Sequence, residues 1–266
     1  MKFDNIKNDY GNAFDYIKLN TAIIKPKQDS ELTNREALWL SVFPATYVIG
    51  PADKESYFDI ESKEQGFDRL VTKIQPFENK IFKNYLDNNY DETLNLRNWL
   101  LQIREGLINV TGCHFSHSII ASDMIKNNIS RAIIFENDCK FIKNIPDSFL
   151  ISLKNLLDTQ DIPFLNLSPI NKTNSTEIAT LGEFKVITGN AAATHSYVMN
   201  LEIAHIVHKS TDINEPTLQS ATGQFPAEQF ARGGADDFFC GYVTNTYSLQ
   251  PMLAYQQAIG GNSKII

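Results

Sequence analysis

A short run of residues without any polar member, Ala132-Ile-Ile-Phe135, constrains the fold of this chain more than any other feature. A strand covered on one face alternates apolar and polar residues, whereas a continuous apolar run is typical of a strand covered on both faces in a mainly parallel sheet. The run is followed directly by Glu136, Asn137 and Asp138. The sequence therefore predicts an α/β fold whose buried central strand ends in two carboxylates.

Patterns before this run predict alternating strands and helices. We expect a strand from about Phe14 to Ile24 and a helix that Thr33 or Asn34 caps, that carries Glu36 in its first turn and that ends at Pro44. A second strand follows from Ala45 and closes at a Gly-Pro turn. Strand, helix and strand at this spacing form a βαβ unit.

The rest of the chain gives weaker but consistent patterns. Residues 54–95 are rich in charge and asparagine, which predicts an insertion or a loop-rich region. Apolar residues at helical spacing predict a helix over 96–106 and another that starts at 112–118, where Ser116 or Ser118 lies near its first turn. Further elements are expected as a helix around 147–157, strands at 164–167, 184–187 and 192–199, and helices beginning near residues 200 and 236.

Length and composition limit the classes of protein to which the chain can belong. With 266 residues, of which 42% are hydrophobic, one domain over 1–266 is expected. The net charge of −7 argues against an extended surface for binding nucleic acid. Because no apolar run reaches the length of a membrane span and no leader is evident, we expect a cytoplasmic protein. Cys113, Cys139 and Cys240 are widely spaced, which favours reduced thiols over a disulfide framework or a zinc site.

The two carboxylates after the buried strand are the main candidate site. In open α/β sheets, ligands bind at the carboxyl ends of the strands, where Glu136 and Asp138 are expected to lie. Carboxylate oxygens suit Mg²⁺ and Mn²⁺, and such an ion can bridge the phosphates of a nucleotide sugar and neutralise the departing diphosphate. A Glu-x-Asp pair without further context is more often a solvated acidic turn.

Further residues place this pair in a longer pattern. Gly112-Cys113-His114-Phe115-Ser116-His117, then a helix, then the run that ends in Glu136-Asn137-Asp138 resembles the signature of glycosyltransferase family 25, which includes lipooligosaccharide galactosyltransferases. Looser similarities lie in the segments 34–50, 189–199, 236–237 and 249–256. The resemblance differs at two positions, since Asn137 replaces the central Asp of the family's Glu-Asp-Asp and Lys264 replaces an Asp near the C-terminus.

The resemblance implies a fold and a reaction. The expected fold is a single Rossmann-like nucleotide-diphospho-sugar transferase domain of type A with a mainly parallel central sheet. The expected cofactor is Mn²⁺ or Mg²⁺, held by Glu136 and Asp138. The donor is expected to be a nucleotide sugar, most simply one linked to UDP, and the acceptor a glycan or another molecule with a hydroxyl group.

Other residues are weaker candidates for the site, and each has a structural alternative. Ser116 and His117 at a helix start can contact the donor phosphates, although an N-cap and a packed histidine are equally consistent. Arg35 can neutralise a phosphate or lie on the surface as a plain charge. Asp236 or Asp237 can serve as the general base for the acceptor, or cap the helix that follows. A histidine on an apolar strand, as at position 195, is more often a core residue.

Three other functions remain open at this point. A transferase that glycosylates a hydroxymethylated base in DNA would need a local basic groove, which the acidic average charge does not indicate. An inactive module that only binds a sugar or nucleotide is consistent with Asn137 and Lys264. A nucleotidyltransferase also uses carboxylates at strand ends, but it would release pyrophosphate rather than a nucleoside diphosphate.

Overall fold

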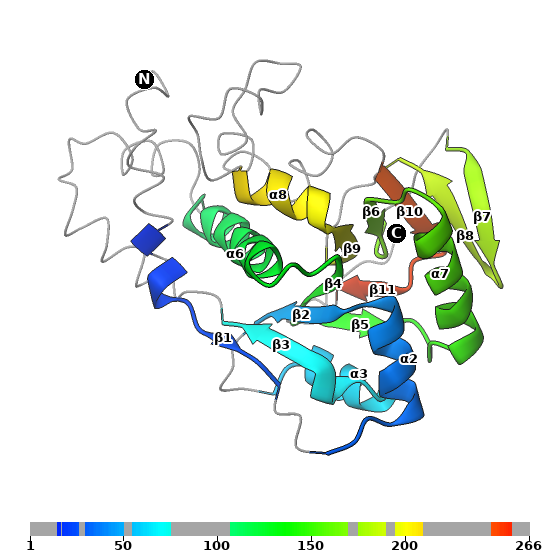
Figure 1. Cartoon of the computed structure of the whole chain (residues 1–266), viewed down its shortest axis with the longest axis horizontal. Helices are drawn as coiled ribbons and strands as arrows, with labels where there is room; N and C mark the ends of the chain where they lie inside the picture. Colours follow the sequence, from blue (N-terminus) through cyan, green and yellow to red (C-terminus); the bar gives the residue numbers. More distant parts are fainter. Residues whose placement is uncertain are drawn as a thin grey trace. The chain divides into compact units, whose positions relative to one another are not determined.

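The computed structural model describes residues 15–16, 18–26, 30–50, 55–75, 107–169, 175–189, 195–209 and 246–256, with side chains from residue 115 onward in the helix that begins at Leu107 (Figure 1). The described residues fall into two compact units. One contains α6 (Leu107–Lys126) and all but the start of α8 (Leu201–Lys209), and the other contains both sheets. A single domain over the whole chain therefore stays a prediction.

In the first unit, polar contacts join the two helices. The hydroxyl of Ser118 donates to the carbonyl oxygen of Val207 at 3.5 Å, and Ser122 Oγ lies 2.9 Å from His208 Nδ1. The sequence predicted both helices, but α6 begins at Leu107, earlier than expected. None of the described helices is long and apolar enough to cross a membrane.

A nine-stranded sheet forms the centre of the second unit, in the order β1-β3-β2-β4-β9-β6-β10-β8-β7. β2 pairs in parallel with β3 and β4, and β6 pairs in parallel with β10, whereas the other five pairings are antiparallel. The expected α/β class is therefore confirmed, but the expectation of a mainly parallel sheet is wrong. The strands are β1 (Ile23–Ile24), β2 (Ala45–Ile49), β3 (Val71–Ile74), β4 (Arg131–Glu136), β6 (Phe164–Asn166), β7 (Glu177–Leu181), β8 (Phe184–Thr188), β9 (Ser196–Asn200) and β10 (Thr246–Gln250).

A second, two-stranded sheet pairs β5 (Cys139–Phe141) with β11 (Ala254–Gln256) in antiparallel register. Two backbone hydrogen bonds attach β11 to its surroundings. Leu253 N donates to Leu167 O at 2.7 Å, just beyond the end of β6, and Ile142 N donates to Leu253 O at 3.1 Å. The small sheet is thus anchored beside the carboxyl end of β6.

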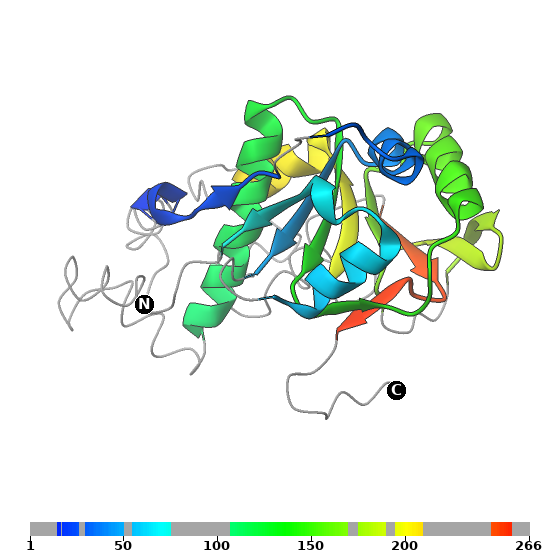
Figure 2. The same ribbon diagram turned by 90° about the horizontal axis from the view of Figure 1, so that it is seen from below.

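Three helices of the second unit share one hydrophobic core with the large sheet: α2 (Asn34–Val42), α3 (Tyr57–Gln65) and α7 (Asp147–Thr159). In Figure 2, α2 and α7 lie side by side. Stacked and tilted aromatic rings form the centre of this core. The rings of Trp39 and Phe67 stack with centroids 3.8 Å apart, and Phe58 lies 4.6 Å from Phe135 of β4. β4 is buried from Ala132 to Phe135, as its apolar run predicted.

The start of α2 is also as predicted. Thr33 caps the helix through a capping box, in which its hydroxyl accepts from Glu36 N at 3.1 Å and its own N–H donates to Glu36 Oε2 at 2.7 Å. This reciprocal pair satisfies backbone donors that would otherwise have no partner at the helix start. Glu36 is buried, and Arg69 forms an ion pair with it at 3.5 Å.

Two expectations about the N-terminal half are corrected. The strand expected from Phe14 to Ile24 is only Ile23–Ile24, and residues 18–20 are helical. The described part of the region expected to be loop-rich, 55–75, contains α3, a 3₁₀ turn at Asp68–Leu70 and β3, which pairs with β2 in the large sheet. Charged residues on α3 masked its few buried positions, so its sequence resembled a loop. The helix expected over 96–106 lies outside the described residues.

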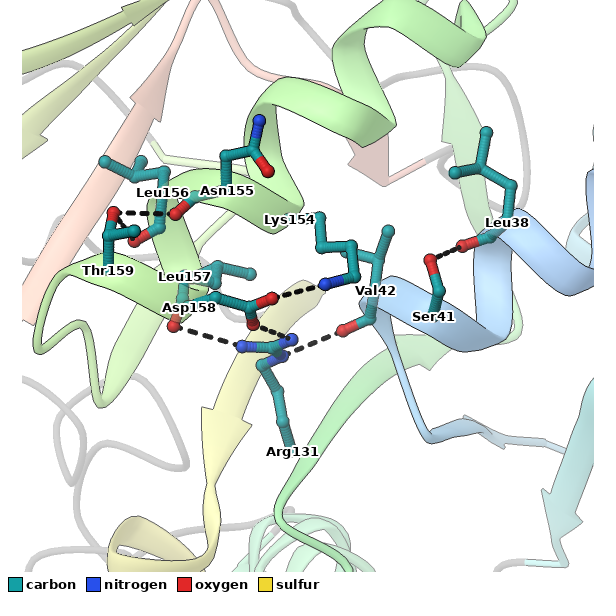
Figure 3. A network of polar contacts seen from close by, with 10 residues as sticks. All are labelled: Leu38, Ser41, Val42, Arg131, Lys154, Asn155, Leu156, Leu157, Asp158 and Thr159. Atoms are coloured by element: carbon teal, nitrogen blue, oxygen red, sulfur yellow. Dashed lines mark hydrogen bonds and ion pairs between the residues drawn. The ribbon is translucent and has the colours of Figure 1, made fainter.

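At the amino end of β4, Arg131 joins the ends of two helices (Figure 3). Its Nε donates to Val42 O at 2.8 Å, at the end of α2, and its Nη1 donates to Leu157 O at 3.2 Å, in the last turn of α7. Its Nη2 also donates to Asp158 Oδ1 at 3.0 Å, while Lys154 pairs with the other oxygen of that carboxylate. One guanidinium thus satisfies carbonyls at two helix C-termini, where cations are favourable.

Candidate metal centre

The carboxyl end of β4 is fixed by hydrogen bonds to strands on both sides. Glu136 N donates to His195 O at 2.9 Å, and Asn137 N donates to Ile49 O at 3.0 Å. Glu136 is in register with Ile49 of the parallel strand β2, so both strands end at the same edge of the sheet. This is the edge where ligands bind in α/β sheets.

Asn137 is a packing residue in the turn after β4. Its carbonyl oxygen accepts from Phe58 N at 3.2 Å, at the start of α3. A Cβ atom built on Gly50 would lie 2.3 Å from the Cβ of Asn137, so the two backbones approach as closely as glycine permits. This position thus has a structural task, which is consistent with the expectation that only the outer residues, Glu136 and Asp138, face an ion.

His195 completes a group of three side chains at this edge. It directly precedes β9, which pairs antiparallel with β4, and its Nδ1 lies 2.7 Å from Glu136 Oε2. Glu136, Asp138 and His195 each offer a ligand atom, and these atoms lie within 4.8 Å of one another. The side chains of Glu136 and His195 are 23% and 21% exposed, so the group is partly open to solvent.

The two oxygens of Asp138 have different surroundings. Oδ2 accepts a hydrogen bond from Gln256 Nε2 at 2.8 Å, whereas Oδ1 is buried and accepts no hydrogen bond from any of the described residues. A carboxylate oxygen withdrawn from water without a partner is unfavourable, and such atoms are rare in folded proteins. A cation at this oxygen would supply the missing interaction.

Cys139 follows Asp138 and fixes the backbone of His195. Its thiol donates to His195 O at 2.7 Å, so this carbonyl accepts both from Cys139 and from Glu136 N. Burial raises the pKa of the Cys139 thiol well above its usual range, and the charges of Glu136 and Asp138 act in the same direction. Cys139 is therefore a neutral donor that positions His195, not a thiolate ligand, as expected for a reduced buried cysteine.

Two carboxylates and one imidazole form a donor set that fits a divalent cation. Carboxylates suit Mg²⁺ and Mn²⁺, while an imidazole nitrogen favours first-row transition ions such as Mn²⁺ over Mg²⁺. The buried, unpartnered Oδ1 of Asp138 agrees with this fit. The three donors found among the described residues are fewer than the about six that Mg²⁺ takes, so positions remain for further ligands such as substrate oxygen atoms.

Arg35 has contacts other than those expected of a phosphate ligand. Its Nε donates to Gln65 O at 3.0 Å, its Nη2 to Ile145 O at 2.8 Å and its Nη1 to Asp147 Oδ1 at 2.5 Å. These acceptors lie at the end of α3 and the start of α7, so the guanidinium connects three helices. These contacts give Arg35 a structural role, and its contact with a phosphate stays a prediction from the sequence.

Ser116 and His117 do not lie at a helix N-terminus, which corrects the reason for assigning them to the donor. α6 begins at Leu107, so both residues lie well inside the helix, and both are buried. The amides that attract phosphate belong to the first turn of a helix only. The candidate general bases, Asp236 and Asp237, lie outside the described residues.

His195 could not be assigned to the site from the sequence, because an isolated histidine in an apolar segment carries no spacing signal. Its contribution depends on β9 lying antiparallel beside β4, which local patterns do not reveal. No known protein family matches the sequence, and no characterised protein shows significant similarity to it. The resemblance to glycosyltransferase family 25 therefore stays a prediction.

Proposed function

We propose that this protein is a metal-dependent glycosyltransferase that moves a sugar from a nucleoside-diphosphate donor to a hydroxyl acceptor. One observation carries the proposal: Glu136, Asp138 and His195 meet at the carboxyl end of β4, where Asp138 keeps a buried oxygen without a hydrogen bond. The sequence pattern that led to the prediction and the cluster in the structure share Glu136 and Asp138. His195 adds a third ligand from a distant part of the chain.

These three residues share one task in the proposed reaction. Glu136, Asp138 and His195 would hold Mn²⁺ or Mg²⁺ beside the phosphates of the donor. When bound, the ion neutralises the negative charge that builds up on the departing nucleoside diphosphate. Because the backbone hydrogen bonds of Glu136 and the thiol of Cys139 fix their surroundings before a donor arrives, the ligands need little rearrangement on binding.

The remaining parts of the reaction are proposals from the sequence. The acceptor is a glycan or another hydroxyl compound, and Asp236 or Asp237 removes its proton. UDP is the nucleotide that the family resemblance implies. No lysine or arginine among the described residues forms an ion pair with Glu136 or Asp138, so these carboxylates keep their charge available for a cation.

Donor hydrolysis and transfer with a panel of nucleotide sugars test the proposal. The protein is incubated with each donor and Mn²⁺, with and without a general mixture of sugar acceptors, and the nucleotide products are separated. We expect release of the nucleoside diphosphate with at least one donor and its loss after chelation by EDTA. Release that persists in EDTA, or no release with any donor, would contradict the proposal. Release of pyrophosphate would identify a nucleotidyltransferase instead.

A further inference from the structure

Gln256 approaches the candidate centre from the small sheet. Its backbone is the register partner of Cys139, the residue directly after Asp138, in the antiparallel pair of β11 and β5. Facing residues in such a pair lie about 5 Å apart, so the side chain of Gln256 begins close to Asp138. Its Nε2 donates to Asp138 Oδ2 at 2.8 Å. The main chain and the side chain of Gln256 thus hold neighbouring residues of the same turn.

This contact determines which Asp138 oxygen is satisfied by the protein. An ionised carboxylate has several acceptor directions on two oxygens, and it can rotate about its Cβ–Cγ bond when nothing fixes it. The amide of Gln256 fixes Oδ2, and Oδ1 remains buried without a hydrogen bond. Gln256 therefore restricts the rotation of the carboxylate and leaves one oxygen for a different partner.

Gln256 suits this role because its amide is neutral. A lysine or arginine in its place would also donate to Asp138, but its positive charge would compete with a cation for the carboxylate. An amide donor orients the carboxylate without neutralising it. Partners of this kind commonly orient ligating carboxylates and are worth about 10- to 100-fold in metal affinity.

We infer that Gln256 is a positioning residue for the metal-binding carboxylate of Asp138. The inference rests on the proposed metal site and assigns to it a residue from β11 that does not itself bind the ion. It follows that the β5–β11 sheet is part of the site. Leu253, which precedes β11, donates a backbone hydrogen bond to Leu167 after β6. This bond and the pairing of β11 with β5 keep Gln256 beside Asp138.

Substitution Gln256→Met tests the inference, because methionine has a similar length but no amide donor. The dissociation constant for Mn²⁺ is measured without any nucleotide, from the electron paramagnetic resonance signal of the free ion. We expect the constant to rise about tenfold in Gln256→Met. In the transfer assay, activity is expected to return towards the wild-type level at saturating Mn²⁺, as positioning of a ligand predicts. Unfolding in urea is measured in parallel to confirm that the fold is retained.

Gln160→Met is the matched control, since Gln160 is exposed at the end of α7 and receives the same change of side chain. Its affinity for Mn²⁺ is expected to equal that of the wild type. Equal affinities of Gln256→Met and the wild type would overturn the inference while leaving the metal site in place. Failure of the wild type itself to bind Mn²⁺ would instead remove the site on which both proposals depend.

Discussion

The charged residues at the two ends of β4 have different kinds of interaction partner. At the amino end, the guanidinium of Arg131 donates to two helix carbonyls and to Asp158, whose carboxylate also pairs with Lys154 (Figure 3). At the carboxyl end, Glu136 and Asp138 contact an imidazole and an amide, and within the described residues neither forms an ion pair with a lysine or arginine. At the amino end the charges pair with protein groups of opposite charge, whereas at the carboxyl end the two carboxylates have no lysine or arginine partner among the described residues.

This difference separates a structural charge from a functional one within a single strand. A cation that caps two helix ends stabilises the fold. Two neighbouring carboxylates repel each other, and among the described residues no lysine or arginine offsets their charge, whereas a bound divalent cation would. Substitutions at the two ends should therefore change different properties.

The largest effect is expected from Asp138→Asn. It removes the charge of the residue with the buried oxygen, and we expect metal-dependent transfer to fall by at least about 1000-fold, or about 4 kcal/mol of transition-state stabilisation. Because repulsion from Glu136 is removed as well, the free energy of unfolding should stay the same or rise. Initial rates and urea unfolding measure the two quantities. Asp161→Asn, at an exposed position, is the matched control. A clear loss of stability in Asp138→Asn would contradict the view that the charge at the carboxyl end of β4 is functional and not structural.

Arg131→Met should produce the opposite result. Loss of the bonds to the carbonyl oxygens of Val42 and Leu157 is expected to lower the free energy of unfolding by about 3 kcal/mol, since hydrogen bonds from a charged group contribute about 1.5 kcal/mol or more each. The ion pair with the exposed Asp158 adds little, as is usual at a protein surface. The rate of transfer per folded molecule should not change. Arg131→Lys keeps the charge but not the planar fork, so an intermediate loss is expected. A fall in activity without a loss of stability would show that the amino end is not purely structural.

His195→Asn tests whether the imidazole at the carboxyl end of β4 is a metal ligand. Removal of the imidazole is expected to raise the dissociation constant for Mn²⁺ about tenfold, or about 1.4 kcal/mol, and to lower the preference for Mn²⁺ over Mg²⁺. Competition titrations with the two ions measure both effects. His205→Asn changes an exposed histidine of α8 and should leave both unchanged. An unchanged ion preference in His195→Asn would remove His195 from the ligand set.

The smallest effect concerns Asp59, which anchors the helix beside the site. Asp59 accepts from Ser56 N at 2.8 Å in a capping box and pairs with Lys73 of β3 at 2.7 Å. Burial alone would raise the pKa of Asp59, but the bonds to Lys73 and Ser56 lower it below the ordinary value. Asp59→Asn should cost about 1 kcal/mol at pH 7, typical of a lost helix cap.

The direction of the pKa shift sets the pH dependence of this effect. Because the folded state has the lower pKa, the stabilisation by Asp59 is complete above the ordinary carboxyl value of about 3.9 and is lost as the pH falls through the folded-state value. Urea unfolding at pH 7 and near pH 2.5 should therefore show a smaller difference between the wild type and Asp59→Asn in acid. A difference that grows in acid would show that the shift has the wrong sign.

Elements marked by an apolar run or by a helix-capping residue could be predicted from the sequence. The apolar run before Glu136 predicted β4 as a buried strand, and Thr33 with Glu36 predicted the start of α2. The antiparallel position of β9 was not predictable, because strand direction depends on connections between distant segments and not on residue pattern. For the same reason His195 was missed.

Gln256 shows a different limit of prediction from the sequence. The segment that ends in Gln256 was noticed through its similarity to a family pattern, yet nothing in the sequence indicated a task for the residue. Its task became evident only when the pairing of β11 with β5 placed it beside Asp138. Polar contacts between segments that lie 59 and 118 residues apart, as these do, have no local signature, so both partners of the carboxylates had to come from the structure.

The close approach of Gly50 to Asn137 restricts how this site can change by mutation. The atom that a side chain at position 50 would meet is the Cβ of residue 137, at 2.3 Å, and a rotation of the side chain cannot move a Cβ away. Every residue other than glycine at position 137 therefore requires glycine at position 50. Exchanges between Asn and Asp at 137 are sterically free, whereas a side chain at 50 is accessible only after 137 has itself become glycine or the turn has moved. The order of substitutions is thus fixed, with position 137 changing before position 50. The charge at position 137 can change, whereas the backbone shape of the turn cannot.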